Sequence, residues 1–227
     1  MLPALIERST MPAIPPDALL FTTPGCVHCH TVQRGLDELV KEGRVGKVTV
    51  VDAIQHPEQA AEYGVRAAPW LRLGSFTLTG TLSIAELRQW AGWASGEEGT
   101  AHYVEHLLGE GGYKQAVAFI AADTHRLKPL LAIVANPDAN ISVRLGVSAL
   151  LEAYANTPEL QMLLPQLAGF SLHADHRVRA DACHLLGLTG SAAARTYIDV
   201  CLKDASKEVR EIAEEAMEKM KKQNTKT

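Results

Sequence analysis

TTPGCVHCHTV, residues 22–32, sets two cysteines three positions apart at a junction between two kinds of apolar pattern. Before it, residues 18–22 form a short apolar run that ends at Pro24-Gly25, which favours a buried strand followed by a turn. After it, apolar residues recur at helical spacing as far as Gly43: Val32, Leu36, Leu39 and Val40. The cysteine pair is therefore predicted to lie at the N-terminus of a helix that follows a strand.

The rest of residues 18–94 continues to alternate between strand-like and helix-like segments. Strands are expected at 48–52, 70–73 and 76–79, and helices at 56–63 and from Ser83 onward, which gives the order βαβαββα. Glu86 follows Ser83 by three residues, as in a capping box. The first strand–helix–strand unit predicts a parallel pair joined by a right-handed crossover, and the hairpin turning at Gly74-Ser75 is expected to add antiparallel edges.

From about residue 100 onward every periodic segment has helical spacing, and a short motif recurs. The motif is Val-Arg-x-x-small, found at residues 143–147, 178–182 and 209–213, each time after a polar turn. A period of this length is typical of helical hairpins that bury their apolar faces by stacking on one another. The expected helix pairs are 101–109 with 113–123, 126–136 with 140–155, 158–169 with 176–188, and 191–203 with 206–221. The arginine of each motif is expected to reach the polar turn of an adjacent repeat.

The chemistry of a CxxC pair depends on forming a thiolate, because only the anion attacks a disulfide. The unpaired N–H groups and the positive dipole end at a helix N-terminus favour that anion, so Cys26 is the expected nucleophile. Cys29, one turn later, is expected to attack the mixed disulfide and release the product. His28 is predicted to tune the redox potential, because an imidazole beside the Cys26 thiolate would stabilise the reduced form.

The strand, the Pro-Gly-Cys-x-x-Cys sequence, the helix and the Ala68-Pro69 pair before a hairpin together resemble the thioredoxin superfamily. The resemblance is to its minimal, glutaredoxin-like form, and it implies an α/β thioredoxin-like domain. In that superfamily a cis-proline lies beside the disulfide, and the residue before it offers backbone hydrogen bonds to the substrate chain. Pro69 and Ala68 match those positions, and the predicted substrate-binding residues are Ala68, Pro69 and Trp70.

Two features depart from the patterns of that superfamily. Thioredoxins carry a buried aspartate on the preceding strand, whereas residues 19–21 are Leu, Leu and Phe. Glutaredoxins hold glutathione with a Gly-Gly pair and a basic residue, where this chain has only Gly80-Thr81 and Thr23. Linkage to glutathione or to a thioredoxin system therefore stays open.

The recurring helical motif resembles short HEAT-like repeats, which implies an α-solenoid that presents an extended surface to other proteins. The expected domain organisation is an N-terminal extension at 1–17, a thioredoxin/glutaredoxin-like domain at 18–95, a HEAT-like α-solenoid at 100–221 and a flexible tail at 222–227. The boundary is expected in the Ser95–Gly99 stretch, where small and charged residues cluster.

Residue His30 extends the cysteine pair to CxxCH, the signature of covalent haem attachment. Haem is disfavoured, because cytochrome c folds are not built from a βαβαββα unit. A zinc site could use Cys26, Cys29 and either His28 or His30, but structural zinc usually needs a second ligand pair. Cys183 and Cys201 lie inside predicted helices and are expected to be small buried hydrophobes. No metal or other cofactor is expected.

Composition narrows the possible partners. The net charge of −4, with acidic and basic residues interspersed, does not indicate a basic surface that would bind a nucleic-acid backbone. No apolar run approaches the ~20 residues that span a bilayer, and no secretory signal is visible. Four cysteines, two of them at CxxC spacing, favour redox chemistry in the cytoplasm over a disulfide scaffold.

These observations predict a thiol-disulfide oxidoreductase whose CVHC dithiol acts on a disulfide substrate and whose HEAT-like domain recruits a protein client. The alternative from a different class is a non-catalytic interaction adaptor with a thioredoxin-like module. The client, the direction of electron flow and the oligomeric state stay open.

Overall fold

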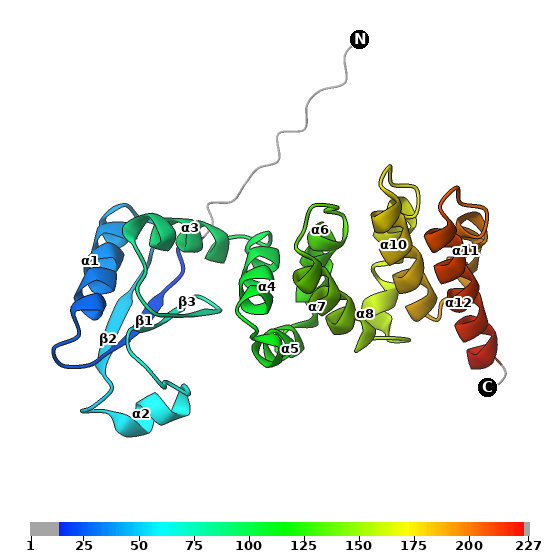
Figure 1. The fold of residues 1–227 in the computed structure, drawn as a ribbon. Coiled ribbons are helices and arrows are strands. Elements are labelled where there is room, and N and C mark those ends of the chain that lie inside the picture. Colours follow the sequence, from blue (N-terminus) through cyan, green and yellow to red (C-terminus); the bar gives the residue numbers. More distant parts are fainter. Residues whose placement is uncertain (1–13, 225–227) are drawn as a thin grey trace, which may run out of the picture. The chain divides into compact units, whose positions relative to one another are not determined.

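The computed structural model describes residues 14–224, with side chains described as far as residue 221. It divides into two compact units, one ending at Gly99 and the other beginning at Thr100 (Figure 1). Residues 1–13 of the predicted extension and residues 225–227 of the predicted tail lie outside the described residues. Helix α12 (Lys207–Asn224) continues into that predicted tail, because lysine and glutamine favour the helix.

A four-stranded mixed sheet forms the centre of the first unit. Its strands are β1 (Ala18–Thr22), β2 (Val48–Asp52), β3 (Trp70–Leu73) and β4 (Phe76–Thr79), in the order β2-β1-β3-β4. β1 and β2 are parallel, and β3 is antiparallel to both β1 and β4. The predicted antiparallel hairpin therefore forms, with β4 as an edge strand, whereas β3 pairs on both sides and lies inside the sheet.

Three helices accompany this sheet: α1 (Val27–Lys41), α2 (Pro57–Glu62) and α3 (Ile84–Ala94). Ala60 of α2 belongs to a core cluster with Phe21, Val51 and Trp70. Side chains alternate along a strand, so Leu20, which is fully buried, faces the opposite side from Phe21. The predicted strands and helices of this unit agree with the structure to within a few residues.

Helices α1 and α3 pack closely where Gly35 faces Leu87. A β-carbon on Gly35 would lie 2.5 Å from the end of the Leu87 side chain, so a larger residue would force that side chain or the helices to shift. The predicted capping box also forms, since the Ser83 N–H donates to Glu86 (2.7 Å) and the Glu86 N–H donates to Ser83 (3.3 Å). The approach at Gly35 thus packs α1, the helix that carries the cysteine pair, against α3.

The second unit is helical in its described part. Its α-helices are α4 (Gly99–Gly109), α5 (Tyr113–Ala121), α6 (Leu131–Val134), α7 (Ile141–Glu152), α8 (Pro158–Gln161), α9 (Leu164–Phe170), α10 (His176–Leu188), α11 (Arg195–Cys201) and α12. Two 3₁₀ helices, η1 (Thr124–Leu130) and η2 (Ala192–Ala194), precede α6 and α11. No helix of the described residues is both long and apolar enough to cross a membrane.

Proline explains two departures from the predicted helix pairs. The segment expected as one helix at 126–136 starts as the 3₁₀ helix η1, which contains Pro129. The segment expected at 158–169 divides into α8 and α9, and Pro165 lies in the first turn of α9. Proline has no N–H to donate to the preceding turn, so each helix is interrupted or restarts there.

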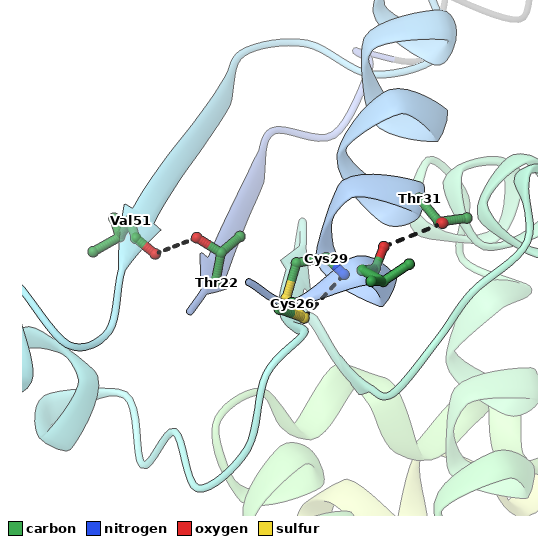
Figure 2. Close-up of a disulfide and its surroundings, with 6 residues drawn as sticks. Thr22, Cys26, Cys29, Thr31 and Val51 are labelled. Atoms are coloured by element: carbon green, nitrogen blue, oxygen red, sulfur yellow. Dashed lines mark hydrogen bonds between the residues drawn. A yellow bond between two sulfur atoms is a disulfide. The ribbon is translucent and has the colours of Figure 1, made fainter. Parts of the chain in front are cut away.

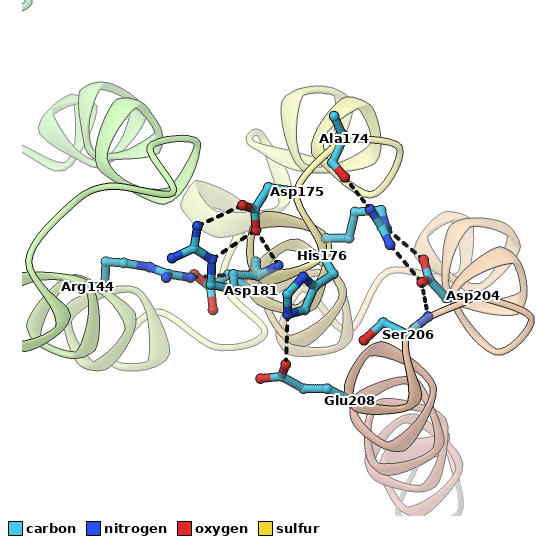
Figure 3. A network of polar contacts seen from close by, with 10 residues as sticks. Arg144, Ala174, Asp175, His176, Asp181, Asp204, Ser206 and Glu208 are labelled. Atoms are coloured by element: carbon cyan, nitrogen blue, oxygen red, sulfur yellow. Dashed lines mark hydrogen bonds and ion pairs between the residues drawn. The ribbon is translucent and has the colours of Figure 1, made fainter.

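Arginine contacts link neighbouring hairpins, but not all in the predicted way (Figure 3). Arg179 binds both carboxylate oxygens of Asp204 (2.7 and 2.8 Å), the polar turn of the next hairpin, as expected. Arg144 instead pairs with Asp181 within helix α10, because the turn residue Asp175 is occupied by Arg177. Arg210 donates to the carbonyl groups of its own turn.

Candidate active site

Cys26 and Cys29 are joined in a disulfide at the start of α1, with their α-carbons 5.3 Å apart (Figure 2). Cys26 is the N-cap of the helix in an extended conformation, and its sulfur accepts a hydrogen bond from the Cys29 N–H at 3.1 Å. This is the helix position expected from the sequence.

The turn before the disulfide depends on a glycine. Gly25 has φ +75, a left-handed conformation that residues with a β-carbon rarely adopt. It lets the chain turn from β1 into α1, where the Cys26 N–H donates to the Thr23 carbonyl at 3.2 Å. Cys26, directly after this turn, is partly exposed to solvent.

The two sulfur positions differ in their surroundings. Cys26 is half-buried and Cys29 is only 2% exposed. When the disulfide is reduced, the N–H groups of the first helical turn and the helix dipole favour a negative charge on the capping sulfur. The geometry thus suits an accessible nucleophile at Cys26 and a shielded resolving thiol at Cys29, the roles predicted for them.

A cleft of about 180 Å³ opens beside the disulfide. Its lining comes from the turn, from α1 and from the end of β2: Thr22, Thr23, Pro24, Gly25, Cys26, Cys29, His30, Gln33 and Asp52. His30 and Gln33 follow Cys26 by four and seven residues, so they share its face of the helix. Asp52 arrives from β2, whose register pairs it with Thr22 at the end of β1.

Three of these lining residues, His30, Gln33 and Asp52, were missed as site residues by the sequence reasoning. The signal for His30 and Gln33 is the helical spacing from Cys26. The signal for Asp52 is that parallel strands end at the same edge of a sheet, next to the helix that follows β1. Oδ1 of Asp52 accepts the N–H groups of Ile54 (2.8 Å) and Gln55 (3.3 Å), which fixes the carboxylate.

His28 lies outside the cleft with an exposed side chain. Residues two apart on a helix do not face each other, so His28 does not share the face of Cys26. The described residues include no hydrogen bond from His28 to either sulfur. Redox tuning by His28 stays a prediction, and the structure adds no contact that supports it.

The Ala68–Pro69 peptide bond is cis, as the family resemblance implies. Phe21 of β1 pairs with Trp70 of β3. Pro69, directly before Trp70 in the sequence, therefore lies at the end of the sheet where β1 leads to the cysteines. The Pro69 carbonyl accepts the Gly80 N–H at 3.0 Å. Among the described residues, the backbone N–H and C=O of Ala68 have no hydrogen-bond partner.

Trp70 has a different position from the one predicted for a substrate-binding residue. Its side chain is 5% exposed and packs against the rings of Phe21 and Tyr63, at centroid distances of 5.5 and 5.9 Å. The indole therefore stabilises the core beneath the site, and the apolar strand context of residues 70–73 explains why.

The two remaining cysteines are free and buried, as predicted for Cys183 and Cys201. A hydrogen bond with the Cys201 thiol, together with burial, raises the pKa of Cys183, so that thiol stays protonated. Within the described residues no three His, Cys, Asp or Glu side chains are grouped as metal ligands.

Comparisons with known proteins agree with this geometry. Residues 19–92 match a family model described as a thioredoxin domain. Over 51 residues the chain is 35% identical to a thioredoxin of Methanocaldococcus jannaschii, a match that covers 22% of this chain and 60% of that protein. Residues 19–92 therefore form a thioredoxin domain, followed by helices that are compatible with a fused helical domain. This domain and the cysteine pair support a redox-type function.

Proposed function

We propose that this protein is a thiol-disulfide oxidoreductase in which Cys26 attacks and Cys29 resolves. The observation that carries the proposal is the disulfide at the N-terminus of α1, with Cys26 as the N-cap of the helix. In the reducing direction, the Cys26 thiolate attacks a substrate disulfide and one substrate sulfur leaves. Cys29 then attacks Cys26, the second substrate sulfur leaves, and two electrons have passed from the dithiol to the substrate.

The substrate chain is proposed to bind along the segment before β3. The unpaired backbone groups of Ala68 can form hydrogen bonds with an extended chain. The adjoining Pro69 lies at the same end of the sheet as the cysteines. Backbone pairing of this kind is largely independent of side-chain sequence, so it suits a site that acts on disulfides in different proteins.

The helical unit is proposed to be a HEAT-like solenoid that recruits a protein client. It exposes large apolar side chains on several successive helices and turns: Ile141, Leu145, Met162, Leu172 and Val200. The Arg179–Asp204 ion pair links one hairpin to the next. Stacked helical hairpins commonly use their extended surfaces to bind other proteins.

The reductant and the compartment belong to the same proposal. We place the protein in the cytoplasm, where two buried free thiols and a catalytic CxxC are the usual pattern of cysteine use. Restoration of the dithiol by glutathione with its reductase, or by a thioredoxin reductase, distinguishes the two possible reducing systems.

Insulin reduction tests the activity. The wild-type protein should reduce insulin with dithiothreitol as the electron source, Cys26→Ser should be inactive, and Cys183→Ala should retain activity as a control for cysteine loss elsewhere. A wild type without activity, or a Cys26→Ser variant as active as the wild type, would favour the alternative of a non-catalytic adaptor.

A further inference from the structure

We infer that His30 is the proton acceptor for Cys29 when the mixed disulfide is resolved. The inference deepens the proposed oxidoreductase function and rests on it. Cys29 must lose its proton before its sulfur can attack Cys26.

Cys29 lies in surroundings that disfavour an unassisted loss of its proton. Its side chain is 2% exposed, and burial disfavours the thiolate relative to the thiol. The neighbouring strand β1 offers no proton acceptor where residues 19–21 are Leu, Leu and Phe. A nearby base must therefore come from the cleft.

The lining of the cleft contains few groups that can exchange a proton. Besides the two cysteines, only His30 from α1 and Asp52 from β2 titrate, because the turn contributes threonine hydroxyls, Pro24 and Gly25. These are the charged and titratable groups that face the disulfide across the described cleft.

His30 is better placed than Asp52 to take the proton. It lies one turn after Cys26 on the same face of α1 and lines the cleft together with both cysteines, and its backbone N–H donates to the Cys26 carbonyl at 3.4 Å. Its side chain is exposed to solvent, and its ring forms no hydrogen bond or ion pair with the described residues. Both ring nitrogens are therefore available, and imidazole is the side chain that accepts and releases protons near neutral pH.

Asp52 is fixed by its own contacts. Its Oδ1 accepts the N–H groups of Ile54 and Gln55, and it forms no ion pair with His30 within 4.0 Å. Asp52 lines the same cleft from the end of β2, and its negative charge favours the imidazolium that forms when His30 takes the proton. Asp52 is thus assigned a supporting electrostatic role.

Atoms and electrons balance in the complete step. In the mixed disulfide, Cys26 is bonded to a substrate sulfur and Cys29 carries its proton. The proton passes to a ring nitrogen of His30, the Cys29 thiolate attacks the Cys26 sulfur, and the bond from Cys26 to the substrate breaks. The substrate sulfur leaves as a thiolate with the electron pair of that bond and takes up the proton from His30.

An aromatic disulfide that releases a coloured thiolate, such as DTNB, separates the two chemical steps. The pre-reduced full chain is mixed rapidly with one equivalent of DTNB over a range of pH. The first coloured thiolate reports attack by Cys26, and the second reports attack by Cys29. Because this leaving group needs no proton, the second rate reports how easily Cys29 is deprotonated.

His30→Gln should slow the second release about a hundredfold at neutral pH, within the range that a positioned acid–base group supplies. The first release, measured in the same trace, should stay within about twofold. Added imidazole should restore part of the lost rate, and the loss should diminish at alkaline pH. His56→Gln, an exposed histidine of the same domain outside the cleft, serves as the matched control.

A His30→Gln variant whose second release matches that of the wild type and of His56→Gln would overturn the inference. So would a loss seen with Asp52→Asn but not with His30→Gln. A wild type that releases no second thiolate would instead contradict the proposed oxidoreductase function, so the two failures are distinguishable.

Discussion

The backbone N–H of Cys29 donates a hydrogen bond to the sulfur of Cys26 at 3.1 Å, so the proposed resolving residue also supplies a hydrogen bond to the proposed nucleophile. The relationship follows from the position of Cys26 as the N-cap of α1, where the first N–H groups of the helix have no partner within the helix. It gives the CxxC spacing a local physical reason, because an N-cap side chain bonds the N–H two or three residues later.

The two cysteines should respond differently to substitution by serine. Cys29→Ser should accumulate a stable mixed disulfide between Cys26 and a substrate protein, because the resolving sulfur is absent. Cys26→Ser should form no such adduct, because Cys29 is shielded from solvent. Non-reducing electrophoresis after incubation with a disulfide substrate provides the measurement, and an adduct in Cys26→Ser would reverse the assigned roles.

Gly25→Ala should destabilise the first unit through backbone strain. The residue has φ +75, and an added β-carbon would meet no atom within 4 Å, so the cost, about 1–2 kcal/mol, comes from the left-handed conformation alone. Gly92→Ala in helix α3 is the matched control, since it also meets nothing within 4 Å but has a helical backbone. It should stabilise by up to about 1 kcal/mol. Urea unfolding measures both, and equal effects would contradict the explanation.

The Arg179–Asp204 pair should make the helical unit sensitive to acid. Hydrogen bonding to Arg179 lowers the pKa of Asp204 in the folded protein. The stabilisation is therefore complete above the ordinary aspartate pKa of about 3.9 and is lost as the pH falls toward the lower folded value. Asp204→Asn should be less stable at neutral pH and should lose part of this acid dependence.

The control for that prediction is Asp175→Asn. Asp175 pairs with Arg177 two residues away on the same turn, and asparagine is also a good N-cap. Its effect on the urea midpoint at neutral pH should be smaller than that of Asp204→Asn, because no contact between hairpins is lost. A larger effect for Asp175→Asn would mean that the contact between hairpins contributes little.

The four thiols of the reduced protein should separate into two classes. Cys26 and Cys29 should react with excess DTNB in the native state, whereas Cys183 and Cys201 should react only after unfolding, because both are at most 1% exposed. Titration with and without denaturant counts the reactive thiols. Rapid native labelling of Cys183 or Cys201 would show that the packing of α10 against α11 opens readily.

The sequence was sufficient for the elements of the first unit because local signals agreed there. The apolar runs, the turn at Gly74-Ser75 and the capping box at Ser83 marked the same boundaries that the structure has. The interior position of β3 was missed, because which strand pairs with β1 depends on contacts between segments far apart in the chain.

The two cysteines of the site could be predicted from the sequence, but the residues that surround them could not. A CxxC before a helix identifies Cys26 and Cys29, whereas the cleft depends on where β2 ends in space, which brings Asp52 beside α1. His28 was singled out because it lies between the cysteines. Helical spacing instead places His30 on the same face of α1 as Cys26. Similarly, Arg144 and Arg179 occupy the same motif position but pair with different residues, Asp181 and Asp204, because the side chains around them differ.

The most direct test of the central claim is a redox titration of the Cys26/Cys29 couple in defined mixtures of reduced and oxidised dithiothreitol or glutathione, with thiol trapping at each point. We expect a two-electron transition with a midpoint between the thioredoxin value of about −270 mV and the value of about −120 mV found for strong oxidases. A pair that shows no reversible transition across this range, or whose sulfurs cannot be trapped in the native protein, would contradict a role in thiol-disulfide exchange.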